Sequence, residues 1–285
     1  MTVNKMRLKR FAEKFIVILF TVSLNSCSVV GQWWYDRLDI YLANYFFEYA
    51  EFTNNQKYFI RKTTKEFKSW NANSELPKYK DFLVEVKTLN KKNTSKDIEK
   101  IIVKGRTLFQ ESYYFFTPYI VTFCEELTDQ QVDEISLSLG KRIDKWKSSL
   151  EESKNEDSVK NSIESFSRFS RFVGVKLTRE QENELKRLYP RIENSGSYSI
   201  EDQKIWNTKL ISILESRKKV GFQSEITLHL DSLLKTLQDN ENDNVYYEMI
   251  AIINTSLNEK QREKFQRRIN YFINALDKII TRQNF

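Results

Sequence analysis

The sequence predicts an all-α protein, a bundle of amphipathic helices that follows a short N-terminal leader. Only 6 glycines and 3 prolines interrupt the 285 residues, so tight turns must be few and helices long. Apolar residues recur every three or four positions, and no segment shows the strict alternation typical of a strand. Hydrophobic residues make up 40% of the chain, which is enough to form a packed core.

The leader combines a basic start with a short apolar run. The basic residues end at Lys14, and the uncharged run from Phe15 to Leu24 follows. A membrane-spanning helix needs about 20 apolar residues, so this run has the length of an export signal. A short anchor that is never cleaved is the alternative, which the length disfavours.

A cysteine stands directly after the apolar run. The segment from Leu24 to Cys27 resembles the lipobox of bacterial lipoproteins, whose cysteine is lipidated and becomes the first residue of the mature protein. The resemblance implies a signal peptide at 1–26, a single envelope domain at 27–285 and a membrane anchor on Cys27. Ser28, in place of aspartate, favours sorting to the periplasmic face of the outer membrane of a Gram-negative bacterium, with the inner membrane as the alternative.

The second cysteine has no partner if Cys27 carries lipid. Cys124 lies in the apolar segment that begins at Tyr119, so we expect a buried, small apolar side chain. A reactive thiol is the alternative.

The mature chain reads as a succession of helices separated by short polar breaks. Positions 34, 38, 41, 45, 49 and 52 are aromatic or leucine and form one helical stripe. The expected helices cover residues 33–52, 53–72, 77–90, 96–126, 129–151, 156–174, 179–189, 200–238, 242–255 and 258–282.

Four of these helices begin with the same pattern, an apolar residue followed by Thr or Asn and, three positions later, Gln. Such a pattern predicts a capping box, in which the cap side chain accepts from a first-turn amide and Gln accepts from the cap amide. The intervals between the caps are 75, 50 and 80 residues, so no fixed-period repeat is indicated. The predicted pairs are Thr53 and Gln56, Thr128 and Gln131, Thr178 and Gln181, and Asn258 and Gln261.

The stretch 45–86 resembles a known group of lipoproteins. It carries Tyr45-Phe46, Phe52, Gln56, Trp70-Asn71, Glu75-Leu76-Pro77, Tyr79 and Leu83. This pattern is similar to the lipoproteins of the domain of unknown function 6279, which have a Trp-His pair where this chain has Trp70-Asn71. The family has no established activity, and Asn71 argues against a metal role at that position.

The Leu-Thr-x-x-Gln elements at 127–131 and 177–181 also resemble those of the periplasmic chaperones Spy and CpxP. Those proteins are helical cradles that hold unfolded clients. The resemblance implies a holding function by analogy.

Motifs for enzymatic chemistry are missing from the sequence. It contains no Gly-rich phosphate loop, His-Glu-x-x-His, Cys-x-x-Cys or Gly-x-Ser-x-Gly, so we expect neither cofactor nor metal. His229, the single histidine, fits a packed or capped imidazole. The acidic run 239–244 lacks glycine at the sixth calcium-loop position and is interpreted as a solvated loop. Of the net charge of +7 the leader contributes +4, and the remaining +3 does not indicate a nucleic-acid partner.

Two surfaces are candidates for binding. The aromatic residues of 33–59 could contact the membrane or fill the core. The last helix carries an excess of basic residues, which indicates a solvated face or an anionic partner: Lys260, Arg262, Lys264, Arg267, Arg268, Lys278 and Arg282. The leading hypothesis is therefore a non-enzymatic lipoprotein that binds envelope proteins or unfolded clients. The alternative is an envelope enzyme or cell-wall adaptor whose carboxylates the fold brings together.

Overall fold

The computed structural model describes residues 28–152, 158–192, 199–238 and 242–283, and all the regular secondary structure in these ranges is helical. The predicted all-α class is confirmed. The leader, with Cys27, lies outside the described residues. The helices are α2 (Ser28–Asp36), α3 (Leu38–Phe47), α4 (Asn54–Trp70), α5 (Leu76–Lys87), α6 (Ser95–Glu125), α7 (Asp129–Glu152), α8 (Ser158–Phe172), α9 (Arg179–Leu188), α10 (Ile200–Glu215), α11 (Phe222–Gln238), α12 (Asp243–Ser256) and α13 (Glu259–Gln283).

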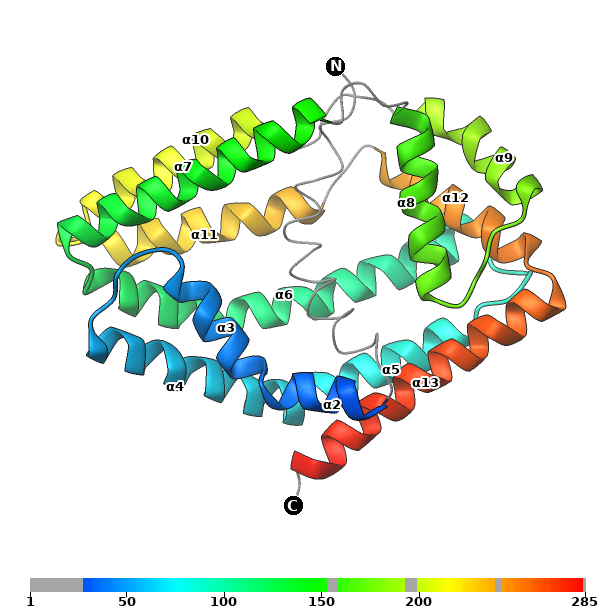
Figure 1. Cartoon of the computed structure of the whole chain (residues 1–285), viewed down its shortest axis with the longest axis horizontal. Coiled ribbons are helices and arrows are strands. Elements are labelled where there is room, and N and C mark those ends of the chain that lie inside the picture. The colour runs from blue at the N-terminus through cyan, green and yellow to red at the C-terminus, as the bar shows by residue number, and fades with distance from the viewer. Residues whose placement is uncertain (1–27, 153–157, 193–198, 239–241, 284–285) are drawn as a thin grey trace.

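The long helix α6 runs through the middle of the molecule and joins two lobes (Figure 1). On one side of it lie α3, α4, α7, α10 and α11, which we call the first lobe. On the other side lie α5, α8, α9, α12 and α13, the second lobe. Helix α6 contacts α4 and α11 in the first lobe and α5 and α12 in the second. One cluster of buried apolar side chains lies in the first lobe, and a larger one fills the second lobe and extends to Leu38 and Leu42 of α3 and Phe67 of α4. Helix α2 packs on α13.

The connection between α4 and α5 is helical, whereas the sequence indicated a break there. Residues Asn71–Glu75 form one π-helical turn, so the backbone stays helical from α4 into α5. Pro77 stands at the second position of α5, directly after the wide turn, in which the Leu76 N–H donates to the Asn71 oxygen. Wide turns of this kind often occur at functional sites.

Two of the predicted helices are divided in the structure. The segment expected at 33–52 is interrupted at Arg37 and ends at Phe47. The segment expected at 200–238 forms α10 and α11, which are joined by a turn ending at Gly221 with φ +92°. Apolar periodicity continues through both breaks, so the pattern alone did not reveal them. Gly221 stands directly before α11, and glycine adopts its left-handed backbone without steric strain.

The turn after α8 leads to a testable prediction. Gly174 has φ +88°, and a Cβ at this position would lie 2.8 Å from the backbone oxygen of Lys264 on α13. Gly174→Ala should therefore lower the free energy of unfolding by about 1–2 kcal/mol, measured by urea denaturation.

Gly140, on α7, is the matched control because a Cβ there meets nothing within 4 Å. Gly140→Ala should leave the stability unchanged or raise it by up to about 1 kcal/mol, since alanine is the better helix former. A loss as large as that of Gly174→Ala would contradict the assignment of close packing at Gly174.

Candidate functional site

The four repeated helix starts form hydrogen-bonded capping boxes. In the box at Thr128, the Gln131 N–H donates to Thr128 Oγ1 at 3.2 Å, and the Thr128 N–H donates to Gln131 Oε1 at 3.1 Å. The other three boxes make the same pair of bonds at 2.9–3.3 Å, and at the fourth Asn258 Oδ1 replaces the hydroxyl. The helix starts are therefore locally satisfied, as their sequences imply.

The boxes also bind to one another in pairs. Gln56 Nε2 donates to Gln131 Oε1 at 2.9 Å, and Gln131 Nε2 donates to Gln56 Oε1 at 2.7 Å. Each amide nitrogen also reaches the backbone of the opposite box, at the oxygens of Glu126 and Glu51. Both glutamines are buried. We call this pair the first clasp; it ties the start of α4 to the start of α7.

The second lobe has the same arrangement. Gln261 Nε2 donates to Gln181 Oε1 at 2.9 Å, and Gln181 Nε2 donates to Gln261 Oε1 at 3.4 Å. Their nitrogens also reach the backbone oxygens of Lys176 and Ser256. In both clasps the backbone acceptor is the residue before the apolar position of the opposite box. This second clasp ties the start of α9 to the start of α13. Each lobe therefore has a glutamine clasp of the same kind.

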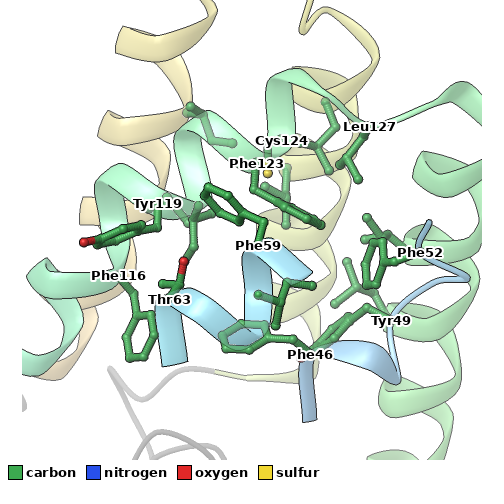
Figure 2. Close-up of a pocket in the computed structure, with 18 of the residues that line it drawn as sticks. Phe46, Tyr49, Phe52, Phe59, Thr63, Phe116, Tyr119, Phe123, Cys124 and Leu127 are labelled. Carbon is green, nitrogen blue, oxygen red and sulfur yellow. The ribbon is translucent and has the colours of Figure 1, made fainter. Parts of the chain in front are cut away.

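An apolar pocket of about 260 Å³ lies beside the first clasp, among α3, α4, α6, α7, α10 and α11. Figure 2 shows aromatic side chains from α3, α4 and α6 around it, with Phe52 and Leu127 on one side. These two residues are the apolar positions of the two clasped boxes. The first clasp therefore holds two walls of the pocket in place. The rings that line it are those of Phe46, Tyr49, Phe52, Phe59, Phe116, Tyr119, Phe123 and Trp206.

The pocket wall offers little polar chemistry. No Asp, Glu, Lys, Arg or His side chain belongs to the lining. Burial raises the pKa of the Cys124 thiol to about 12, so this lining thiol is neutral at physiological pH and a poor nucleophile. The hydroxyl of Tyr119 donates outward to Glu66 Oε2. The pocket is thus suited to an apolar group.

A second apolar pocket of about 280 Å³ lies in the second lobe, among α5, α6, α8, α12 and α13. Its lining includes Leu257, the apolar position of the box at Asn258, and again no charged side chain. Asn254, one of its few polar lining residues, donates from Nδ2 to the Asn90 backbone oxygen at 2.7 Å. Each lobe therefore combines a clasp with an adjoining apolar pocket.

The π-helical turn holds a buried polar cluster. Tyr35 donates from its hydroxyl to Asn71 Oδ1 at 3.0 Å, so Asn71 serves as an acceptor inside the core. Glu75 is fully buried and accepts from Lys78 Nζ at 2.7 Å. That hydrogen bond raises the pKa of Lys78. Within the described part of the chain, Asn71 Nδ2 and Glu75 Oε2 have no hydrogen-bond partner.

His229, the single histidine, lies on α11 and packs against α10. His229 stacks on Trp206 with ring centroids 4.5 Å apart, and burial lowers its pKa. Its Nε2 lies 3.0 Å from the Trp206 backbone oxygen, so it is a packed imidazole. The described residues contain no group of three or more metal-ligating side chains.

The interpretation of 239–244 as a solvated loop is wrong for residues 242 and 243. Residues 239–241 lie outside the description, but Asn242 and Asp243 are buried. Asp243 Oδ2 accepts from Arg106 Nη1 at 2.6 Å, an ion pair with a helix 137 positions away in the chain. A partner so distant leaves no local signal in the sequence.

Sequence reasoning also missed the buried Arg217. Its Nε donates to the Leu127 backbone oxygen at 2.7 Å, its Nη1 donates to the Leu214 oxygen at 2.9 Å, and its Nη2 bonds Asp129. Arg217 thus fastens the end of α10 to the box at Thr128. Nothing in the local pattern distinguishes it from the neighbouring exposed lysines.

Comparison with known proteins adds one match. The model of a family of unknown function, DUF6279, matches residues 48–242. No curated protein and no solved structure matches the chain, so the resemblance to Spy and CpxP is unsupported by these comparisons. Among the described residues, no helix is long and apolar enough to cross a membrane.

Proposed function

This chain belongs to the family of unknown function DUF6279, and we propose that it is a lipid-anchored protein of the bacterial envelope, held by Cys27. Its helical body binds apolar side chains of another protein chain without catalysis. The observation that carries this proposal is the pair of apolar pockets, one in each lobe, each beside a glutamine clasp.

The chemistry of the pockets supports binding of apolar groups. Their walls consist mainly of aromatic and aliphatic side chains, and burying such groups gains about 25 cal/mol per Å² of apolar area removed from water. The walls offer few hydrogen-bond partners, so burying the backbone of a client would cost free energy. We expect the client's apolar side chains to enter the pockets while its backbone stays in water. Contacts of this kind are weak and sequence-tolerant, which suits the holding of unfolded clients.

The alternative, an envelope enzyme or cell-wall adaptor, needs carboxylates that face each other across a cleft. Neither pocket is lined by a carboxylate. Glu75 is fully buried in the π-helical turn and does not line either pocket. We therefore favour the binding function.

The proposal is tested by light scattering of a chemically unfolded client protein in the presence of the chain from Ser28 onward. We expect suppression of aggregation without ATP or metal. Thr63 is buried and lines the first pocket, so Thr63→Phe should fill part of the space. If the variant loses about 1 kcal/mol of binding free energy for the client, about five times more variant than wild type is needed to suppress half of the aggregation.

Thr107→Phe, at an exposed position of α6, is the control for the added ring. It should suppress aggregation as wild type does, and circular dichroism should show that both variants fold. No suppression by wild type at several-fold molar excess would reject the holding function. Equal activity of Thr63→Phe and wild type would reject the first pocket as the site.

A further inference from the structure

Helices α2 and α3 present an apolar face to solvent. Trp33 is 49% exposed, Ile40 52% and Tyr41 38%, and these three large side chains stand within nine positions of one another. Trp33 stands on α2 and the other two on α3, and Arg37, where the two helices join, lies between them in the sequence. We call Trp33, Arg37, Ile40 and Tyr41 the exposed aromatic face.

This exposure does not come from poor packing of the two helices. Their opposite side is fully buried, because Tyr35, Leu38 and Leu42 belong to the core cluster. The exposed aromatic face is also ordered by its own contacts. The Arg37 guanidinium lies 4.1 Å from the Trp33 ring centroid, and Tyr41 stacks on Trp34 at 5.6 Å. The helices therefore have two apolar sides, of which the core uses one.

The position of the face in the chain restricts what can cover it. Helix α2 begins at Ser28, the residue directly after Cys27 in the sequence. At about 1.5 Å of rise per residue, Trp33 lies about 8 Å along the helix from Ser28. A lipid on Cys27 would thus bring the exposed aromatic face to the membrane surface.

The surrounding charge fits an anionic surface. The last turns of α13 lie near α2 (Figure 1), and these two helices are in contact. Lys278 and Arg282 are exposed in these turns, while Asp277 is paired with Lys80 at 2.6 Å. On α2 and α3 themselves, Asp36 is exposed and Asp39 is paired with Lys68 at 2.6 Å. Basic side chains near a membrane each gain about 1 kcal/mol from anionic lipid headgroups.

We propose that the exposed aromatic face rests among the lipid headgroups of the membrane that carries the anchor. This inference rests on the anchoring part of the proposed function and is independent of the pockets. Trp and Tyr side chains partition to the membrane interface, where the ring is apolar and the polar edge stays hydrated. Arg37 has the long stem that lets a charged head reach the headgroups. The contact fixes the orientation of the body on the membrane.

The test uses the full chain, processed in a Gram-negative host and reconstituted into vesicles of phosphatidylethanolamine and phosphatidylglycerol. Ile40→Cys is labelled with an environment-sensitive fluorophore, and the vesicles carry a spin-labelled lipid as quencher. We expect blue-shifted emission that the lipid quenches. Val220→Cys, fully exposed in the turn between α10 and α11, is the control and should show neither effect.

The labelling is specific because Cys124 is buried and Cys27 is expected to carry lipid. Flotation of the unlabelled wild type with the vesicles tests the anchor separately. If the protein floats and the label at position 40 behaves like that at position 220, the membrane contact is rejected while the anchor stands. A blue shift without quenching by lipid would also overturn the proposal, because it would assign the face to a protein contact.

Discussion

Replacement of Gln131 by alanine is expected to lower the free energy of unfolding by about 3–5 kcal/mol. The Gln131 amide makes hydrogen bonds with the Thr128 N–H, the Glu51 oxygen and both polar atoms of Gln56. Alanine leaves the Thr128 N–H and the Glu51 oxygen without this partner, and the Gln56 amide keeps only the Thr53 N–H and the Glu126 oxygen. A lost hydrogen bond costs about 1 kcal/mol, and a buried group left unsatisfied costs about 1–3 kcal/mol. Urea denaturation followed by circular dichroism measures the loss.

Gln130→Ala is the matched control, since Gln130 is exposed and bonds only Glu134 among the described contacts. Its stability should stay within about 0.5 kcal/mol of wild type. A double-mutant cycle with Gln56→Ala separates the clasp from the cap, because the coupling between the two glutamines should be about 1–2 kcal/mol. Strict additivity of the two substitutions would show that the clasp contributes nothing beyond the two caps.

Replacement of Arg217 by methionine is the second large expected effect. The guanidinium is buried and satisfies the backbone oxygens of Leu127 and Leu214. Methionine keeps the apolar stem but loses all the donors, so the free energy of unfolding should fall by about 2–4 kcal/mol. Little of this loss comes from the ion pair itself, because Asp129 is almost fully exposed and screened by water.

Lys219→Met controls for the loss of a positive charge, since Lys219 is exposed two positions further along the chain. Its stability should change by less than about 0.5 kcal/mol. Asp129→Asn should likewise cost little, which distinguishes hydrogen bonding to the carbonyls from charge pairing. If Asp129→Asn were as damaging as Arg217→Met, the ion pair would be the main contribution.

Together the two variants test how the pocket of the first lobe is held. Gln131 and Arg217 both fasten the segment around Leu127, which lines this pocket. A substitution that weakens the clasp should therefore weaken client binding as well as folding. In the second lobe, Gln261 corresponds to Gln131, because it caps the helix that follows Leu257 and bonds the opposite box.

The sequence by itself determined the helical class, the four capping boxes and the family. These features are local, because a cap involves residues three positions apart and an amphipathic stripe repeats within two turns. The same reasoning failed at Arg37 and at 216–221, where apolar spacing continues through a change of direction.

Only the tertiary structure decided which boxes meet. Each clasp glutamine accepts at its oxygen from its own cap and from the opposite glutamine, and it donates from its nitrogen to a box 75 or 80 residues away. The local sequence accounts for the bond within each cap but not for the bond between caps, because that bond depends on how the intervening helices pack. The two pockets and the partner of Asp243 are undetermined for the same reason, since each is formed by helices that meet only after folding.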